Sequence, residues 1–420
     1  MGRLRIVRAF VLARWLRRFR SRAQLERFQD RRVRRHLRAL RRRAPWFADA
    51  PERLHDLPLM DKSVMMANFD AMNTVGITLD DAVALATDAE RRRDFGGTLD
   101  GVSVGLSSGT SGHRGVFVVS AAERDDWAGT MLALTLPRGR ILGHRIALFL
   151  RADNELYETV RSRAVEFRYF DVRGDLAQRI RSLAEYAPTI LVAPPSVLLA
   201  IADAGLALRP QRVYAVAEVL ERADARRLEA AFAQPVIHQL YQCTEGFLAR
   251  TCERGVLHLN EELVRIEREP AGDGRFVPIV TDFSRLAQPI VRYRLNDLLV
   301  ERAEPCGCGS VLTALERIEG REDDALVLGG ARVFADLVAR AMIHAEGFAE
   351  YRVVQTGPAS LDVHLDDPGG AESVREQLER LWQRQGVPAP ALRFRSFQPD
   401  LSRKLRRVER AWKEAADATA

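Results

Sequence analysis

Hydrophobic and polar positions alternate along the middle of the chain in a way that predicts strands followed by helices. Short apolar runs that are typical of buried strands occur near residues 145–150, 165–170, 189–193, 212–217 and 236–240. Stretches with helical periodicity occur near residues 175–186, 195–204 and 221–233. Such alternation favours a largely parallel sheet that is covered by helices.

The pattern changes on both sides of this region. Residues up to about 90 are mostly helical in pattern, and residues from about 255 to 319 form a β-rich stretch. Beyond Gly320 a smaller unit is predicted, with helices near 335–345 and 371–386 and strands near 351–355, 361–365 and 392–397. We therefore expect an α/β fold in which a basic helical region (1–90) packs on a large domain (91–322) with mixed or parallel sheets and a β-rich subdomain, followed by a small α+β domain (323–420).

The first 43 residues are strongly basic. They hold seventeen arginines against Glu26 and Asp30, a balance of +15, whereas the whole chain has a net charge of +7 and the remainder therefore carries 7 − 15 = −8. Apolar residues recur in this segment at roughly helical spacing. Two interpretations stay open: helices that dock an apolar stripe on the body and leave arginines solvated, or a surface for an acidic partner such as a carrier protein or a membrane. No nucleic-acid-binding motif accompanies the charge.

The bulk composition is that of a globular protein. The chain has 420 residues, of which 47% are hydrophobic and 29% charged. No apolar run approaches the roughly 18 residues of a membrane span, and the segment 6–16 is interrupted by Arg8 and Arg14, so it is a poor signal-peptide core. We expect a cytoplasmic protein without a transmembrane segment.

A loop of serine, glycine and threonine joins two apolar runs, 102–106 and 116–119. It consists of Ser107, Ser108, Gly109, Thr110, Ser111 and Gly112. Glycines allow backbone N–H groups to turn inward, and hydroxyl groups add donors around one anion, so the loop could hold a phosphate. By itself, such a composition is more often that of a plain surface turn.

Six segments in order resemble the motifs of the acyl-adenylate-forming enzyme superfamily, and especially its phenylacetate–CoA ligase branch. They are the loop 106–112, Ala217-Glu218-Val219, the segments 241–246, 292–297 and 320–324, and Ser402–Arg407. The resemblance extends from about residue 40 to 410. It implies an enzyme that joins a carboxylic acid to AMP with ATP and Mg²⁺ and then transfers the acyl group to a thiol, with a small mobile C-terminal domain.

The resemblance also implies roles at the nucleotide phosphates and the base. Residues 107–112 would bind phosphate, with Arg114 in place of the lysine that usually follows this loop. Thr244 would contact phosphate, Glu245 would bind Mg²⁺, and Tyr241 would stack on adenine beside Ala217 and Glu218. The alternative for this segment is that Tyr241 belongs to the core and Glu245 caps a helix.

The C-terminal motifs complete the implied site. Asp297 would accept the ribose hydroxyls, Arg321 would also reach the nucleotide, and Asp323 would be the hinge of the small domain. Lys404 would be the catalytic lysine that contacts the carboxylate and the α-phosphate. Only three of the 64 basic residues are lysine, so a lysine within this arginine-rich segment is conspicuous.

Three cysteines and one histidine form a candidate metal site. Cys252 and His258 lie six residues apart, and Cys306 and Cys308 follow in a short glycine-containing segment. Three thiolates and one imidazole suit a closed, tetrahedral, structural Zn²⁺, and related ligases carry similar segments. The alternative is a set of small residues without metal in two tight turns. Cys243 lies inside the nucleotide motif and is expected to pack.

These motifs predict an ATP-dependent acid–thiol ligase. The resemblance favours an aromatic acid, and the thiol would belong to coenzyme A or to the phosphopantetheine arm of an acyl carrier protein, for which the basic N-terminus suggests an acidic surface. The alternative is a protein that has lost catalytic activity and that binds an adenylate or docks a carrier protein. A P-loop nucleoside triphosphatase is a poorer alternative still, because no Gly-x₄-Gly-Lys-Ser/Thr motif is present.

Overall fold

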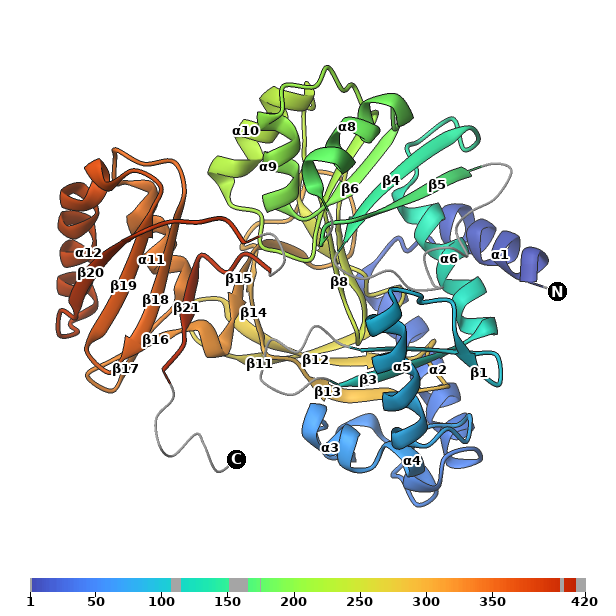
Figure 1. Ribbon diagram of the computed structural model, residues 1–420. Coiled ribbons are helices and arrows are strands. Elements are labelled where there is room, and N and C mark those ends of the chain that lie inside the picture. The colour runs from blue at the N-terminus through green and yellow to red at the C-terminus, as the bar shows by residue number, and fades with distance from the viewer. Residues whose placement is uncertain (1, 107–114, 151–164, 174, 401–403, 413–420) are drawn as a thin grey trace.

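A long sheet runs through the large part of the molecule (Figure 1). The computed structural model describes residues 2–106, 115–150, 165–173, 175–400 and 404–412. The strands at one end of the sheet lie in the order β5 (Val165–Asp171), β4 (His144–Leu150), β6 (Ile190–Ala193), β7 (Arg212–Val216) and β8 (His238–Cys243), and all neighbours are parallel. The helices between them are α8 (Leu176–Tyr186), α9 (Pro195–Asp203) and α10 (Arg222–Phe232). The predicted parallel sheet is confirmed.

The predicted β-rich stretch continues this same sheet. A two-residue turn at Thr244 and Glu245 reverses the chain after β8, so that β9 pairs with β8 in antiparallel fashion. The order then runs through β9 (Gly246–Thr251), β10 (Leu257–Leu259), β15 (Ala314–Arg321), β14 (Asp297–Glu301), β12 (Arg275–Asp282) and β11 (Arg265–Pro270), while β13 (Ile290–Arg294) pairs with β12. The result is one mixed sheet of 12 strands in the described chain.

The strands that flank the serine–glycine loop do not belong to that sheet. β2 (Val102–Leu106) and β3 (Val116–Ser120) form an antiparallel pair, and β1 (Thr98–Leu99) adds to it. Strands that follow each other closely along the chain can pair in antiparallel fashion, and in the described chain the parallel strands begin only with β4. α5 (Leu79–Arg92) packs on this small sheet, and α6 (Ala121–Thr135) follows it.

The basic N-terminal segment folds onto the body. α1 (Gly2–Val11) lies along α6, and Gly129 permits the contact because a Cβ there would stand 2.2 Å from the Ile6 carbonyl oxygen. A short π-helix (Leu12–Leu16) links α1 to α2 (Arg22–Arg41), which buries Leu25 and Leu37. The shorter helices η2 (Pro45–Phe47), η3 (Leu54–Asp56), α3 (Lys62–Ala67) and α4 (Phe69–Met72) complete this region.

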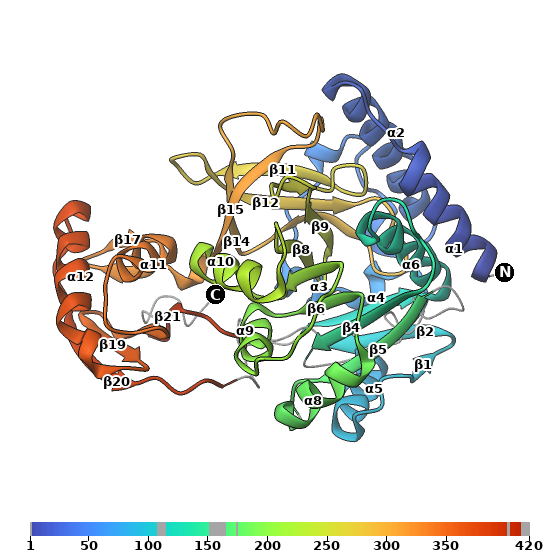
Figure 2. The same cartoon turned by 90° about the horizontal axis from the view of Figure 1, so that it is seen from above.

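The C-terminal part has its own core to one side of the large sheet (Figures 1 and 2). A 3₁₀ turn, η4 (Glu322–Asp324), leads into the hairpin β16 (Leu326–Leu328) and β17 (Ala331–Val333). The remaining elements are α11 (Ala335–Ile343), β18 (Tyr351–Gly357), β19 (Ser360–Leu365), η5 (Pro368–Gly370), α12 (Ala371–Gln385), β20 (Ala391–Ser396) and β21 (Val408–Arg410). Their strands form a sheet in the order β20-β19-β18-β21. The predicted α/β fold class is confirmed.

Among the described helices, none combines the length and the apolar character that crossing a membrane requires.

Candidate active site

A cavity of about 1330 Å³ opens where the two parts of the chain meet. Residues from the end of β8, from β14 and β15, from η4 and from the segment before β21 line it. The structure brings nine of the predicted site residues to this one cavity: Ala217, Glu218, Tyr241, Thr244, Glu245, Asp297, Arg321, Asp323 and Lys404. Such a volume is large enough to hold a nucleotide and a small acid together.

The predicted phosphate-binding residues, Ser107, Ser108, Gly109, Thr110, Ser111, Gly112 and Arg114, lie outside the described residues. The strand that leads into them is described, and its last residue, Leu106, lines the cavity. The proposed role of the loop in binding phosphate stays a prediction.

Tyr241, Asp297 and Arg321 form one polar group on neighbouring strands. The Tyr241 hydroxyl donates to Asp297 Oδ2 at 2.5 Å, and Arg321 Nε lies 3.9 Å from Asp297 Oδ1. Asp297 and Arg321 are register partners of β14 and β15, which fixes their side chains beside each other. Burial, with the nearby Asp297 carboxylate, raises the pKa of Tyr241, so its hydroxyl stays a donor at neutral pH.

Glu245 lies in the tight turn between β8 and β9. No helix begins here, so the alternative that Glu245 caps a helix is wrong. The Tyr293 phenol hydrogen-bonds to Glu245, and burial, with the Glu245 charge, raises the pKa of Tyr293. Arg285 donates to the Thr244 carbonyl and holds the other residue of the turn. A single carboxylate at a cavity wall fits Mg²⁺ if phosphate oxygens and water supply the remaining ligands.

Glu218 has contacts that the sequence did not predict. Its two carboxylate oxygens accept the backbone N–H of Ser196, at the start of α9, at 3.2 Å and the backbone N–H of Leu405 at 3.0 Å. The preceding Ala217 has a left-handed backbone with φ of 66°, which is strained for a residue other than glycine and turns the chain after β7. Glu218 therefore ties the large part of the molecule to the residue that follows Lys404.

Charged side chains hold the Lys404 segment at the cavity. Arg407 Nη2 pairs with Asp224 of α10 at 2.8 Å, and Arg407 Nη1 pairs with Glu350 at 2.9 Å. Arg406 pairs with Asp324, next to the predicted hinge residue. The Asn296 side chain in turn donates to Asp323. Sequence reasoning missed Asp224 because nothing in the pattern of α10 distinguishes it from a solvated helix residue.

Cys243, between these groups, packs as expected. It lies against the hydrophobic cluster beneath the large sheet, and its thiol lies 3.7 Å from the Gly246 carbonyl, to which it donates. Burial raises the pKa of Cys243 far above its usual value, so the thiol stays neutral.

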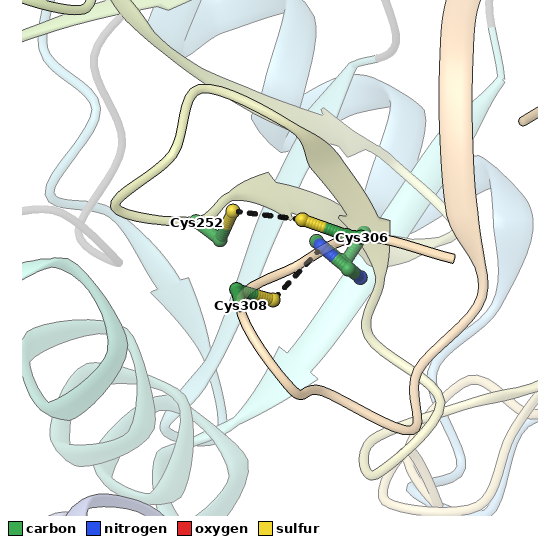
Figure 3. A group of neighbouring side chains, drawn as sticks. Cys252, Cys306 and Cys308 are labelled. Carbon is green, nitrogen blue, oxygen red and sulfur yellow. Dashed lines mark hydrogen bonds between the residues drawn. The ribbon is translucent and has the colours of Figure 1, made fainter. Parts of the chain in front are cut away.

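The four predicted metal ligands come together (Figure 3), and none of them lines the large cavity. The ligand atoms of Cys252, His258, Cys306 and Cys308 all lie within 4.8 Å of one another. Cys252 Sγ is 3.8 Å from Cys306 Sγ, and Cys308 Sγ is 3.5 Å from His258 Nε2. His258 Nδ1 lies 3.1 Å from the Leu312 carbonyl. A proton donated there leaves the Nε2 lone pair facing the thiols, as a zinc ligand requires.

Comparison with known proteins supports this reading of the fold. No protein-family model matches the chain. A segment of 117 residues is 30% identical to phenylacetate–coenzyme A ligase of Thermus thermophilus, and the match covers 26% of each protein. The chain thus matches about a quarter of the length of this curated relative.

Solved structures are similar over nearly the whole chain. 2-Hydroxyisobutyryl-CoA ligase in its postadenylation state, in complex with 2-HIB-AMP, has a TM-score of 0.68 at 15% identity, covering 92% of this chain and 90% of that one. In its thioesterification state, in complex with 2-HIB-AMP and CoA, the TM-score is 0.55 at 17% identity, covering 93% of this chain and 91% of that one. Anthranilate–CoA ligase in complex with anthranoyl-AMP gives 0.51 at 15% identity over 71% of this chain and 64% of that one.

The chain therefore has the fold of these solved ligases, and this is the fold that the resemblance inferred from its motifs implies. The relatives and neighbours named above are CoA ligases.

Proposed function

We propose that the protein is an ATP-dependent acid–thiol ligase that forms an acyl-adenylate. The observation that carries this proposal is the presence of Lys404, Glu245 and Asp297 at one cavity, although they are far apart in the sequence. The higher similarity to a postadenylation state than to a thioesterification state of one neighbour fits this placement of Lys404. The solved neighbours are complexes with an acyl-AMP, and one of them also holds CoA.

In the first step, a carboxylate oxygen of the acid attacks the α-phosphate of ATP, and pyrophosphate leaves with the electron pair of the broken P–O bond. The two anions repel each other, so a cation between them lowers the barrier, and the Lys404 ammonium supplies it. The Asp297 carboxylate accepts the ribose hydroxyls and fixes the nucleotide. Mg²⁺, when bound at Glu245, would neutralise phosphate charge.

In the second step, a thiolate attacks the acyl carbon, and AMP leaves as the thioester forms. The thiol belongs to coenzyme A or to the phosphopantetheine arm of a carrier protein. The outward face of α2 offers a set of exposed arginines that suits an acidic carrier: Arg27, Arg31, Arg34, Arg35 and Arg38.

A structural Zn²⁺ held by the Cys/His cluster is part of the proposal. Cys252 follows β9, His258 lies in β10, and Cys306 and Cys308 lie in the connection from β14 to β15. Four ligands leave no open position, so the metal would join two chain segments and take no part in the reaction.

The decisive experiment is pyrophosphate–ATP exchange with a panel of carboxylic acids. The wild-type protein should catalyse exchange with at least one acid. Lys404→Ala should reduce this exchange about 10²–10³-fold while leaving ATP affinity unchanged, since the lysine acts on charge that develops in the transition state. Lys404→Arg, which keeps the charge but not the shape, should recover only part of the activity. Tight ATP binding without exchange for any acid would instead indicate a non-catalytic adenylate-binding protein.

A further inference from the structure

The large cavity reaches the basic N-terminal region as well as Lys404. Arg8 of α1, Arg17 after the π-helix and Arg32 of α2 line the same cavity as Lys404 and Glu245. In both Figure 1 and Figure 2, α1 lies on the opposite side of the molecule from α11 and α12. The cavity therefore has a cationic wall from the N-terminal region that is separate from the C-terminal segment carrying Lys404.

Among the described residues, Arg17 and Arg32 differ from neighbouring arginines in their hydrogen bonds and ion pairs. Arg5 pairs with Asp126 at 2.6 Å, Arg14 donates to three backbone carbonyls, and Arg22 pairs with Glu261 at 2.5 Å. In the described part of the chain, the guanidinium groups of Arg17 and Arg32 form no hydrogen bond or ion pair.

Arg32 stacks on the Phe283 ring at 5.4 Å, and its buried Nε atom has no acceptor among the described residues. Burial lowers the pKa of both Arg17 and Arg32, because their guanidinium groups are partly removed from water. A ligand anion would supply the missing acceptor.

The acidic side chains nearby are already engaged. Asp126 pairs with Arg5, and Glu262 pairs with Arg250 at 2.7 Å. Asp282 accepts the backbone N–H and the hydroxyl of Ser284, and burial raises its pKa. Among the described residues, none of these carboxylates lies within ion-pair distance of Arg17 or Arg32, so no direct ion pair there neutralises the two guanidinium groups.

The backbone before Arg17 is unusual in a way that positions it. The segment Leu12–Leu16 is a π-helix, and the Arg17 N–H closes its last turn on the Leu12 carbonyl at 2.8 Å. π-Helical turns are rare and occur frequently at functional sites. The wider turn rotates the following residue relative to an α-helix, and Arg17 lines the cavity while Arg18 is exposed.

Apolar side chains also line this cavity, among them Leu12, Trp127, Met131, Phe247 and Leu263. Resting on the function proposed above, we propose that the acid substrate carries a second anionic group at the end remote from the activated carboxylate, and that Arg17 and Arg32 bind this group. The reacting carboxylate then meets Lys404, while the apolar walls hold the connecting chain. A simple monocarboxylic acid would leave the two guanidinium groups desolvated and unpaired.

The test compares matched pairs of monocarboxylic and dicarboxylic acids of equal chain length in pyrophosphate–ATP exchange. For the wild-type protein, kcat/KM should be higher for a dicarboxylic acid than for its monocarboxylic partner. Arg17→Gln and Arg32→Gln should each raise KM for the dicarboxylic acid about tenfold or more, because each removes a charge-assisted hydrogen bond, and should leave KM for ATP unchanged. Arg18→Gln and Arg20→Gln, at nearby exposed positions, are the matched controls.

A preference for monocarboxylic acids with no effect of Arg17→Gln would overturn this inference and leave the ligase function standing. A rise in KM for coenzyme A or pyrophosphate, with KM for the acid unchanged, would overturn it too, because the arginines would then serve phosphate groups. If no acid supports exchange, calorimetric titration of the dicarboxylic acids decides: binding lost in Arg17→Gln supports the anion site, and no binding to wild type refutes it.

Discussion

The Arg407 guanidinium, just before β21, forms an ion pair of 2.8 Å with Asp224 of α10, so a residue three positions after Lys404 is bound to the large part of the molecule. Both side chains are largely buried, at 9% and 12% exposure. Arg407 also contacts Glu350 and stacks on the Tyr351 ring at 5.1 Å. A rotation of the C-terminal part that withdrew Lys404 would have to break the Asp224 pair and the Glu218–Leu405 hydrogen bond.

Asp224→Asn should therefore slow adenylation more than thioester formation. Without the Asp224 charge, the buried Arg407 guanidinium has one fewer ion pair, so the segment that holds Lys404 at the cavity is bound less firmly. We expect pyrophosphate–ATP exchange to fall at least about tenfold, while thioester formation from added acyl-AMP stays near the wild-type rate. Asp203→Asn, which removes an exposed pair with Arg227, is the control. Equal loss in both half-reactions would mean that Asp224 merely stabilises the fold.

Glu221 should make the stability of the contact between α10 and the segment around Arg407 depend on pH. Burial raises the pKa of Glu221 from 4.5 to about 7. Because the pKa is higher in the folded state, the contribution of Glu221 to the free energy of unfolding is complete below pH 4.5. It is lost as the pH rises to about 7, because the buried carboxyl group must then be charged. The charged or titratable groups around it are Asp224, Arg317, Asp336, Tyr351 and Arg407.

Replacing Glu221 with Gln should remove this dependence. The variant should gain roughly 1–3 kcal/mol relative to wild type between pH 5 and pH 8, measured by urea denaturation at each pH. Glu304→Gln, at an exposed position, should leave the free energy of unfolding and its dependence on pH as in wild type. Parallel pH dependence in wild type and Glu221→Gln would contradict the assignment.

The Cys/His cluster should contain zinc. Elemental analysis of the purified protein should give about one zinc per chain. Cys306→Ser should lose the metal and unfold at lower urea concentration, since the bound ion joins the β9–β10 hairpin to the connection after β14. Cys243→Ser should keep the metal, because Cys243 lies outside the cluster. Correctly folded wild-type protein with negligible zinc would dispose of the site.

The docking of α2 depends on one buried carboxylate. Glu261, whose side chain is 2% exposed, accepts Arg22 and the backbone N–H of Thr313 at 2.7 Å. Arg22→Ala leaves this charge without its cation and should lower the free energy of unfolding by roughly 1–3 kcal/mol. Arg27→Ala, on the exposed face of the same helix, should have almost no effect. Equal stability of the two variants would show that the apolar stripe alone holds α2.

The parallel strands were predictable because strands buried on both faces are nearly continuous apolar runs, as in Ile146–Leu150. β15 gave no such signal, because its sequence contains Glu316, Arg317 and Glu319. The buried Glu319 is compensated by Arg317 of the same strand and by Arg275, which pairs with it at 2.8 Å. That pairing joins residues 44 positions apart and cannot be seen in a local pattern.

In the candidate site, too, some residues could be predicted from the sequence and others could not. Asp297, Glu245 and Lys404 could be proposed because they belong to short motifs whose order resembles a family. Arg17 could not, because its significance is the lack of a partner among the described residues, which depends on the whole tertiary structure. Glu218 was singled out by its motif, but its hydrogen bond to Leu405 could be found only once the C-terminal segment was placed.

The register that sets Asp297 opposite Arg321 has a mechanical consequence. β15 carries Arg321 and passes directly into η4, which contains Asp323, so the proposed pivot is anchored to the ladder that would hold the ribose. A swing of the C-terminal part about Asp323 would carry Lys404 away without moving either ribose contact. The adenylate would thus stay bound while different residues of the C-terminal part come to face it.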